Sequence, residues 1–179
     1  MQAARELTMA NQALDICQIA RDHYDAVYRF CARRIGVEHA ADLAQETFLT
    51  AQRALGRYEG RSELKIWLFG IAHNECRRMA RDRRLKPTPM QLDEAPDGQD
   101  AEQTLIDREA LRCALDRLSP EHRQVVLLRE VEGLSYEEAG KVLGIPEGTV
   151  KSRLHHAFLL LRKSLSDLPP TTVREETRR

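Results

Sequence analysis

The sequence predicts an all-α protein made of two small helical domains joined by a flexible acidic linker. Three observations lead to this prediction. Apolar residues recur with the 3.6-residue period of an amphipathic helix over most of the chain, and no useful length of alternating strand pattern appears. A stretch rich in proline and acidic residues separates the two helical halves. In the second half, two helical segments flank a short turn containing glycine, which is typical of a helix-turn-helix.

Composition excludes several protein classes. Of the 179 residues, 42% are hydrophobic and 31% are charged, which is enough apolar material for a packed core. The longest apolar run, at 157–161, is far shorter than the ~20 residues that span a bilayer, and the first residues lack the apolar segment of a signal peptide. The four cysteines are too widely spaced for a zinc site and lie among apolar neighbours, which predicts buried free thiols. We therefore expect a cytoplasmic protein with no membrane insertion, no cofactor and no metal.

The first domain, expected over residues 1–86, contains three helical patterns. These patterns cover residues 19–35, 40–55 and 65–85, and Gly36 ends the first of them. Residues 87–103 then combine prolines with acidic and polar side chains, which predicts a flexible linker.

The second domain is expected over residues 104–168, followed by a tail at 169–179. Ser135 and Glu138 have the spacing of a capping box at the start of a short helix, which Gly144 ends. A last helix follows after the turn, over about residues 147–166. This arrangement predicts the helix-turn-helix.

Charge is distributed unevenly, although the net charge is zero. Residues 69–86 carry six basic and two acidic side chains, and residues 148–166 carry four basic side chains and no acid. The intervening residues 87–110 carry seven acids and one base. Phosphate binding depends on local positive charge, so two basic helices indicate nucleic-acid binding despite the balanced total.

The faces of the two basic helices can be assigned at 100° per residue. On the last helix, the apolar side chains of Val150, Leu154, Ala157 and Leu161 cluster on one side. The candidate base or phosphate readers lie elsewhere on this helix, at Lys151, Ser152, His155 and His156. On the helix at 65–85, a basic stripe opposite the apolar one comprises His73, Arg77, Arg81 and Arg84. An exposed loop at 57–62, whose Tyr58 could stack on an unpaired base, precedes it.

These segments resemble the bacterial extracytoplasmic-function (ECF) RNA polymerase sigma factors. The segments similar to region 2 of that family are Asp42–Phe48, Tyr58–Ser62 and Trp67–Asn74. Those similar to region 4 are Leu118–Glu121, Leu134–Ala139 and Gly148–Leu154. The resemblance covers about residues 20–86 and 104–166, in the family's order and spacing. One departure is Gly140, where the family usually has alanine.

The resemblance implies a role for each segment. For binding the beta-prime clamp of core RNA polymerase it implies Asp42, Gln45, Glu46 and Phe48. For melted minus-10 DNA it implies Tyr58, Arg61, Trp67, His73, Asn74, Arg77, Arg78 and Arg81. For minus-35 duplex it implies Thr149, Lys151, Ser152, Arg153, His155 and His156. It also implies contact with the polymerase beta flap, and an anti-sigma factor as a partner.

Two other classes of protein were weighed against a sigma factor. A helix-turn-helix repressor or activator that works without core polymerase would explain the second domain but not the region 2 segments. An enzyme of the helical metal-dependent class would need clustered carboxylates or histidine pairs three or four residues apart, and the sequence offers no convincing set. We therefore expect a protein that acts by binding and has no catalytic residues.

Overall fold

The computed structural model describes residues 15–82 and 101–166, with side chains from Glu109 onward in the second stretch. Throughout these residues the regular structure is helical, as predicted. The predicted linker lies mostly outside the described residues, and the predicted tail lies entirely outside them.

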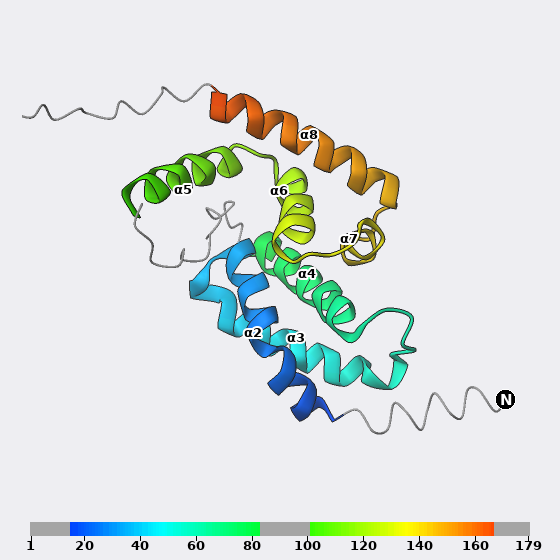
Figure 1. The fold of residues 1–179 in the computed structure, drawn as a ribbon. Coiled ribbons are helices and arrows are strands. Elements are labelled where there is room, and N and C mark those ends of the chain that lie inside the picture. The colour runs from blue at the N-terminus through cyan, green and yellow to red at the C-terminus, as the bar shows by residue number, and fades with distance from the viewer. Residues whose placement is uncertain (1–14, 83–100, 167–179) are drawn as a thin grey trace, which may run out of the picture.

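The first helical unit is a bundle of three long helices (Figure 1). They are α2 (Ile16–Ile35), α3 (Val37–Ala54) and α4 (Leu64–Asp82), and a short 3₁₀ turn, η1 (Leu55–Arg57), follows α3. Each long helix contacts the other two, so the bundle has a closed core. The residues 83–85 predicted to end the third helix lie outside the described stretch.

Local sequence explains where these helices begin and turn. The Asp15 carboxylate accepts a hydrogen bond from the Cys17 amide and caps the start of α2. Gly36, with φ of 108°, separates α2 from α3 with no intervening loop. In the core, the Phe30 ring stacks on the Phe69 ring with 4.8 Å between centroids, which fixes α2 against α4.

The second helical unit contains the predicted helix-turn-helix. Its elements are α5 (Ala101–Asp116), α6 (Pro120–Val126), the π-helical η2 (Leu127–Val131), α7 (Tyr136–Leu143) and α8 (Glu147–Ser166). Helix α8 packs on α5, α6 and α7. The start of α5 lies inside the segment predicted as linker, because the alanine, glutamate and glutamine residues there favour helix.

The turn between α7 and α8 is set by capping and by two glycines. Both hydrogen bonds of the predicted capping box are present: the Glu138 amide donates to Ser135 Oγ, and the Ser135 amide donates to the Glu138 carboxylate. Gly144 ends α7 in the left-handed region, with φ of 67°. At Gly140 a Cβ atom would lie 2.8 Å from the Ile145 carbonyl oxygen, so glycine lets the turn fold back tightly on α7.

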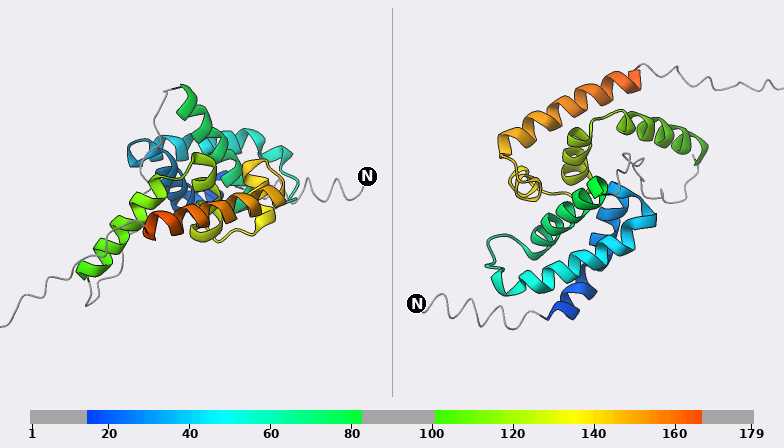
Figure 2. Two further views of the ribbon diagram at one scale, coloured as in Figure 1. Left: turned by 90° about the horizontal axis from the view of Figure 1, so that it is seen from above. Right: turned by 180° about the vertical axis from the view of Figure 1, so that it is seen from behind.

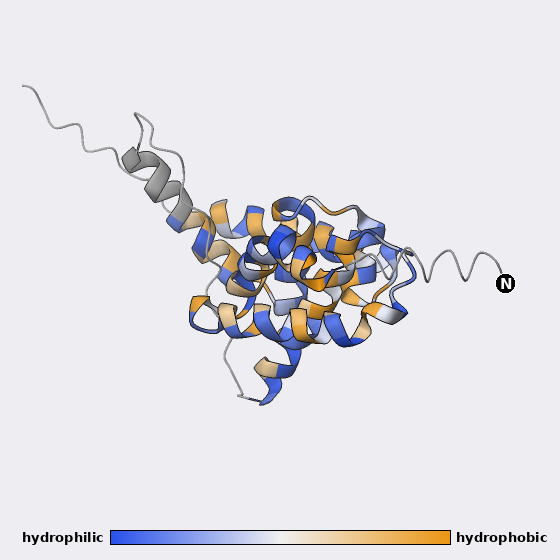
Figure 3. Cartoon of the chain, turned by 90° about the horizontal axis from the view of Figure 1, so that it is seen from below, coloured by the Kyte–Doolittle hydropathy of each residue, from blue (hydrophilic) through white to orange (hydrophobic). Residues whose placement is uncertain are grey.

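The two units pack against each other through α4 and α7 (Figures 1 and 2). Their buried apolar side chains form one contiguous cluster. Apolar and hydrophilic residues alternate around each helix in the hydropathy view, as expected for helices that each bury one stripe (Figure 3).

The cysteines agree only in part with the prediction of buried thiols. Cys31 and Cys76 are fully buried, whereas Cys17 is exposed and Cys113 is half-buried. The prediction is therefore wrong for Cys17, whose position in the first turn of α2 leaves it at the surface of the bundle.

Substitution of Gly140 tests the tightness of the turn. We expect Gly140→Ala to lower the free energy of unfolding by about 1–3 kcal/mol, because the new methyl group meets a backbone oxygen that cannot move without opening the turn. Helix propensity alone would predict the opposite sign, a gain of about 1 kcal/mol. Urea unfolding followed by circular dichroism measures the difference.

The matched control is Gly70→Ala, in α4, where a Cβ atom would meet no atom within 4 Å. This variant should gain stability as propensity predicts. If Gly140→Ala were stabilised as much as Gly70→Ala, the close approach at Ile145 would not constrain the turn.

Candidate nucleic-acid interface

Helix α8 presents the predicted reading face to solvent. The four residues predicted to face the core, Val150, Leu154, Ala157 and Leu161, are buried. The side chains of Lys151, Ser152, His155 and His156 are exposed, and those of Thr149 and Arg153 are half-exposed. The burial pattern thus agrees with the orientation assigned from the sequence, with polar side chains available along the side of α8 away from the core.

Hydrogen bonds and ion pairs hold several of these side chains. Lys151 Nζ lies 2.6 Å from a Glu147 carboxylate oxygen and 5.3 Å from the centre of the Tyr136 ring. His156 Nδ1 lies 2.8 Å from the Ser152 carbonyl oxygen. Both side chains of the Lys151–Glu147 pair are exposed, so the pair is weak and leaves the ammonium group available to another anion.

The start of α6 lies beside the reading face, which the sequence did not reveal. The His122 ring stacks near the His156 ring with 6.4 Å between centroids, and Ser119 Oγ lies 3.1 Å from His122 Nδ1. Hydrogen bonds from the Glu121 amide and from Ser119 lower the pKa of the Glu121 carboxyl, and the positive charge of Arg153 adds to this effect. No sequence spacing links α6 to this side of α8, because the contact depends on how the two helices cross.

The polar side chains of α4 differ in their surroundings. Arg77 and Arg81 of the predicted basic stripe are exposed, and so is Asn74 on its flank. Arg78 is directed toward acidic side chains: its Nη2 lies 2.7 Å from Glu75 and 3.8 Å from Glu46.

The structure does not place His73 on the exposed stripe. Its side chain is only 3% exposed, and Nδ1 is buried without a hydrogen-bond partner. Burial and the nearby positive charges of Arg34 and Arg77 lower the pKa of His73 to about 3. The imidazole is therefore neutral at physiological pH and belongs to the core of the first unit.

The loop before α4 forms a small aromatic pocket of about 240 Å³. The Tyr58 ring lies against the Trp67 ring with 4.8 Å between centroids, and the Tyr58 hydroxyl donates to the Ser62 carbonyl over 2.6 Å. Arg61, which pairs with Glu59, is highly exposed at the rim. Burial, with a smaller effect of Glu63, raises the pKa of Tyr58, so its hydroxyl stays protonated and continues to donate.

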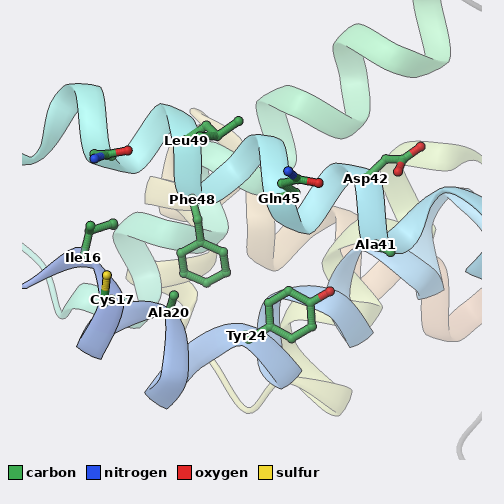
Figure 4. A pocket seen from close by; sticks show the side chains of 10 residues that line it. Ile16, Cys17, Ala20, Tyr24, Ala41, Asp42, Gln45, Phe48 and Leu49 are labelled. Atoms are coloured by element: carbon green, nitrogen blue, oxygen red, sulfur yellow. The ribbon is translucent and has the colours of Figure 1, made fainter.

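A groove of about 470 Å³ runs between α2 and α3 (Figure 4). The Phe48 ring points into it and stacks near the Tyr24 ring with 6.2 Å between centroids. Asp42, Gln45 and Leu49 line its α3 side. The structure thus brings three of the four predicted polymerase contacts together in an apolar groove with a polar rim.

The fourth predicted contact, Glu46, lies on another side of α3. It lines a separate hollow between α3 and α4, together with Glu75 and Arg78. Asp42 and Glu46 therefore have different neighbours, although they are four residues apart.

Within residues 15–82 and 109–166, no group of three or more histidine, cysteine or acidic side chains could hold a metal ion. None of the helices in these stretches is long and apolar enough to cross a membrane.

Comparison with known proteins identifies the family. The "Sigma-70 region 2" model matches residues 19–86, and the "Sigma-70, region 4" model matches residues 108–161. The chain is 33% identical over 170 residues to the RNA polymerase sigma factor YlaC of Bacillus subtilis. This match covers 88% of this chain and 93% of that protein. It belongs to the ECF sigma factors of RNA polymerase. The region 2 match corresponds to α2–α4, and the region 4 match to α5–α8.

Other relatives agree with this assignment. This sigma factor is 39% identical to the ECF RNA polymerase sigma factor SigE of Mycolicibacterium smegmatis over 83% of the chain, but the match spans only 61% of that protein's length. Among solved structures, it resembles the sigma factor RpoE of Bartonella quintana, determined in complex with the anti-sigma factor NepR. That match has a TM-score of 0.64 and 26% identity, and it covers 85% of this chain and 97% of the other.

Burial of His73 predicts a pH dependence of stability. Its pKa is about 3 in the folded state and about 6.5 unfolded, so the unfolded chain binds the extra proton between these values. The stabilising contribution is therefore complete above pH 6.5 and is lost as the pH falls toward 3, at about 1.4 kcal/mol per pH unit.

Replacing the imidazole should remove this contribution. We expect His73→Gln to flatten the dependence of the free energy of unfolding on pH between 7 and 4, measured by urea denaturation at each pH. His155→Gln, which removes an exposed imidazole from α8, serves as the control and should keep the slope of the original protein. An unchanged slope in His73→Gln would contradict the assignment.

Proposed function

We propose that this sigma factor binds core RNA polymerase and directs transcription from promoters that it recognises at two elements. In the proposal, domain 104–168 reads the minus-35 duplex and domain 1–86 binds core polymerase and the melted minus-10 strand. The observation that carries the proposal is the orientation of α8, which buries its apolar stripe and leaves a polar, basic face outside the helix-turn-helix. The chain acts by binding, in the cytoplasm, and the chemistry belongs to the polymerase.

For the minus-35 element, α8 would enter the major groove with its N-terminal half. Lys151 lies near the positive end of the helix dipole and is suited to a phosphate. Ser152, His155 and His156 are exposed beyond it and are suited to base edges, while Thr149 and Arg153 flank them.

For the minus-10 element, the aromatic pocket would hold an unpaired base. Tyr58 and Trp67 supply stacking surface, and Arg61 supplies positive charge at the rim. The exposed Asn74, Arg77 and Arg81 would follow the backbone of the melted strand along α4, while Arg78 would have to leave its acidic partners first.

For core polymerase, the groove between α2 and α3 is the proposed binding surface. Its apolar floor and its rim of Asp42 and Gln45 would accept helices of the beta-prime clamp, with Phe48 in the floor and Glu46 on the adjacent side. Region 4 would contact the beta flap. An anti-sigma factor is a proposed further partner, supported by the similarity to a sigma factor solved in such a complex.

Charge reversal at the groove tests the core-binding proposal. We expect the double substitution Asp42→Lys and Glu46→Lys to abolish co-purification with core polymerase, because it places one positive charge at the rim of the groove and another on the adjacent side of α3. Asp22→Lys, a single charge reversal at an exposed site on α2 that does not line the groove, is the control and should bind normally. If the double variant still co-purified with core, the groove would not be the binding surface. A repressor acting alone would bind no core in any variant.

Two substitutions at Tyr58 separate stacking from loop support. Tyr58→Ala should weaken binding of the melted strand by ~1–3 kcal/mol, which should slow open-complex formation on a duplex promoter. A pre-melted template should restore much of the rate. Tyr58→Phe keeps the ring and removes only the hydrogen bond to Ser62, so it should lose less. Equal losses on duplex and pre-melted templates would show that Tyr58 only supports the loop.

A further inference from the structure

A buried ion pair connects the two regions of this sigma factor. Arg33 Nη1, on α2 of region 2, lies 2.6 Å from Glu132 Oε1, just after η2 of region 4. Each side chain is only 8% exposed, although 99 residues separate them in sequence. A pair so short and so shielded exists only while the two regions are docked, because separating them returns both charges to water.

The segment that carries Glu132 is held in place from two sides. Glu132 follows the π-helical turn η2, and its amide donates to the Leu127 carbonyl. Next to it, the Arg129 guanidinium lies 4.2 Å from the centre of the Tyr136 ring and donates to the Leu134 carbonyl, which joins η2 to the start of α7. Glu132 is therefore presented to region 2 by a well-supported turn.

The contacts around this ion pair also join region 2 to region 4. Helix α4 contacts α7, and the buried apolar side chains of the two regions are continuous. The Glu138 carboxyl of α7 has a lowered pKa, chiefly because it accepts hydrogen bonds from the Ser135 amide and hydroxyl, with further contributions from Lys141 and from Lys65 of α4. The positive charge of Lys65 in region 2 thus acts on an acid of region 4, although the two side chains form no direct ion pair.

This docked arrangement is incompatible with simultaneous binding of both promoter elements. Elements centred near minus-35 and minus-10 are separated by about 25 base pairs, or about 85 Å along the duplex. Here α4 contacts α7, which a short turn joins to α8, and α4 and α8 are each only about 30 Å long. The 18 residues between Asp82 and Ala101 could extend over as much as about 60 Å, so the regions can separate without unfolding.

We propose that the Arg33–Glu132 pair is an intramolecular latch that holds regions 2 and 4 in a closed state, which must open before the protein can engage a promoter. The closed state is the docked arrangement in which this pair and the α4–α7 contact are both formed. The latch is a property of the chain alone and needs no partner. Its importance for transcription rests on the function proposed above.

The physical chemistry of a buried ion pair suits this role. Such a pair adds little net stability, because the attraction between the charges barely offsets their loss of hydration, so the closed state can still open. Removing one partner is much more costly, because the remaining charge is buried without compensation. The pair therefore strongly disfavours docked geometries in which either charge is unpaired, but it adds little to the stability of the closed state.

Charge swaps at the two positions test the latch in the full-length chain. Arg33→Glu and Glu132→Arg each place two like charges together in the closed state, whereas the double variant restores an opposite pair in reverse. Arg29→Glu makes the same charge change at an exposed site one helical turn away and is the control. Thermal unfolding of each variant checks that both regions remain folded.

Two measurements on the free protein report the closed state. Carbodiimide cross-linking followed by mass spectrometry scores the products that join a side chain of region 2 to one of region 4, and small-angle X-ray scattering gives the radius of gyration. In each single variant we expect the cross-link yield to fall at least about tenfold and the radius of gyration to rise. The double variant and Arg29→Glu should resemble the original protein.

Two outcomes would overturn the proposal. One is a cross-link yield and radius of gyration in the folded single variants equal to those of the original protein. The other is a double variant that remains as open as the single variants. These measurements use neither polymerase nor DNA, so their failure is distinct from failure of the sigma-factor function, which the core co-purification experiment tests. If the latch exists, the open single variants should also bind core polymerase more tightly than the control.

Discussion

Burial of one apolar stripe per helix is the constraint on which the rest of this structure depends. On α8 the stripe of Val150, Leu154, Ala157 and Leu161 sits against α5, α6 and α7, and this leaves Lys151, Ser152 and His155 with no position other than the outside. The proposed reading face is therefore a consequence of core packing. A helix in a small domain cannot rotate its polar face without exposing its apolar one.

The same constraint acts differently on α4, which contacts α2 and α3 of its own region and also α7 of the other region. The helix therefore has less free surface than a simple amphipathic helix. His73 becomes buried and neutral, Arg78 is drawn toward Glu75, and the exposed Asn74, Arg77 and Arg81 remain for the proposed contact with a melted strand. Fewer basic side chains of α4 are available for DNA than the sequence alone would suggest.

Glycine and charge together shape region 4. The Ile145 carbonyl oxygen of the α7–α8 turn lies 2.8 Å from the position that a Cβ atom of residue 140 would occupy. The glycine found here in place of the usual alanine therefore has a packing reason. The π-helical η2 then carries Glu132 to a position where it meets Arg33 of region 2. Local backbone geometry in region 4 thus contributes to its contact with region 2.

The sequence by itself determined the elements that depend on local interactions. Helical periodicity, the capping box at Ser135 and Glu138 and the glycine at the end of α7 predicted the helix-turn-helix, because capping and helix propensity act over only a few residues. The orientation of the N-terminal half of α8 was also predictable from its apolar stripe, whereas Phe158, Leu159 and Leu160 farther along the helix are apolar and exposed. Roles at individual DNA and polymerase contacts remain predictions.

Tertiary structure alone decided the features that depend on how helices cross. Burial of His73, the groove that unites Asp42 and Gln45 but separates them from Glu46, the approach of His122 to His156 and the Arg33–Glu132 pair all join residues from different elements. No short-range sequence pattern predicts these contacts, because the same helix face could pack against several other elements. The fold selects among them through the total burial and charge of all the elements together.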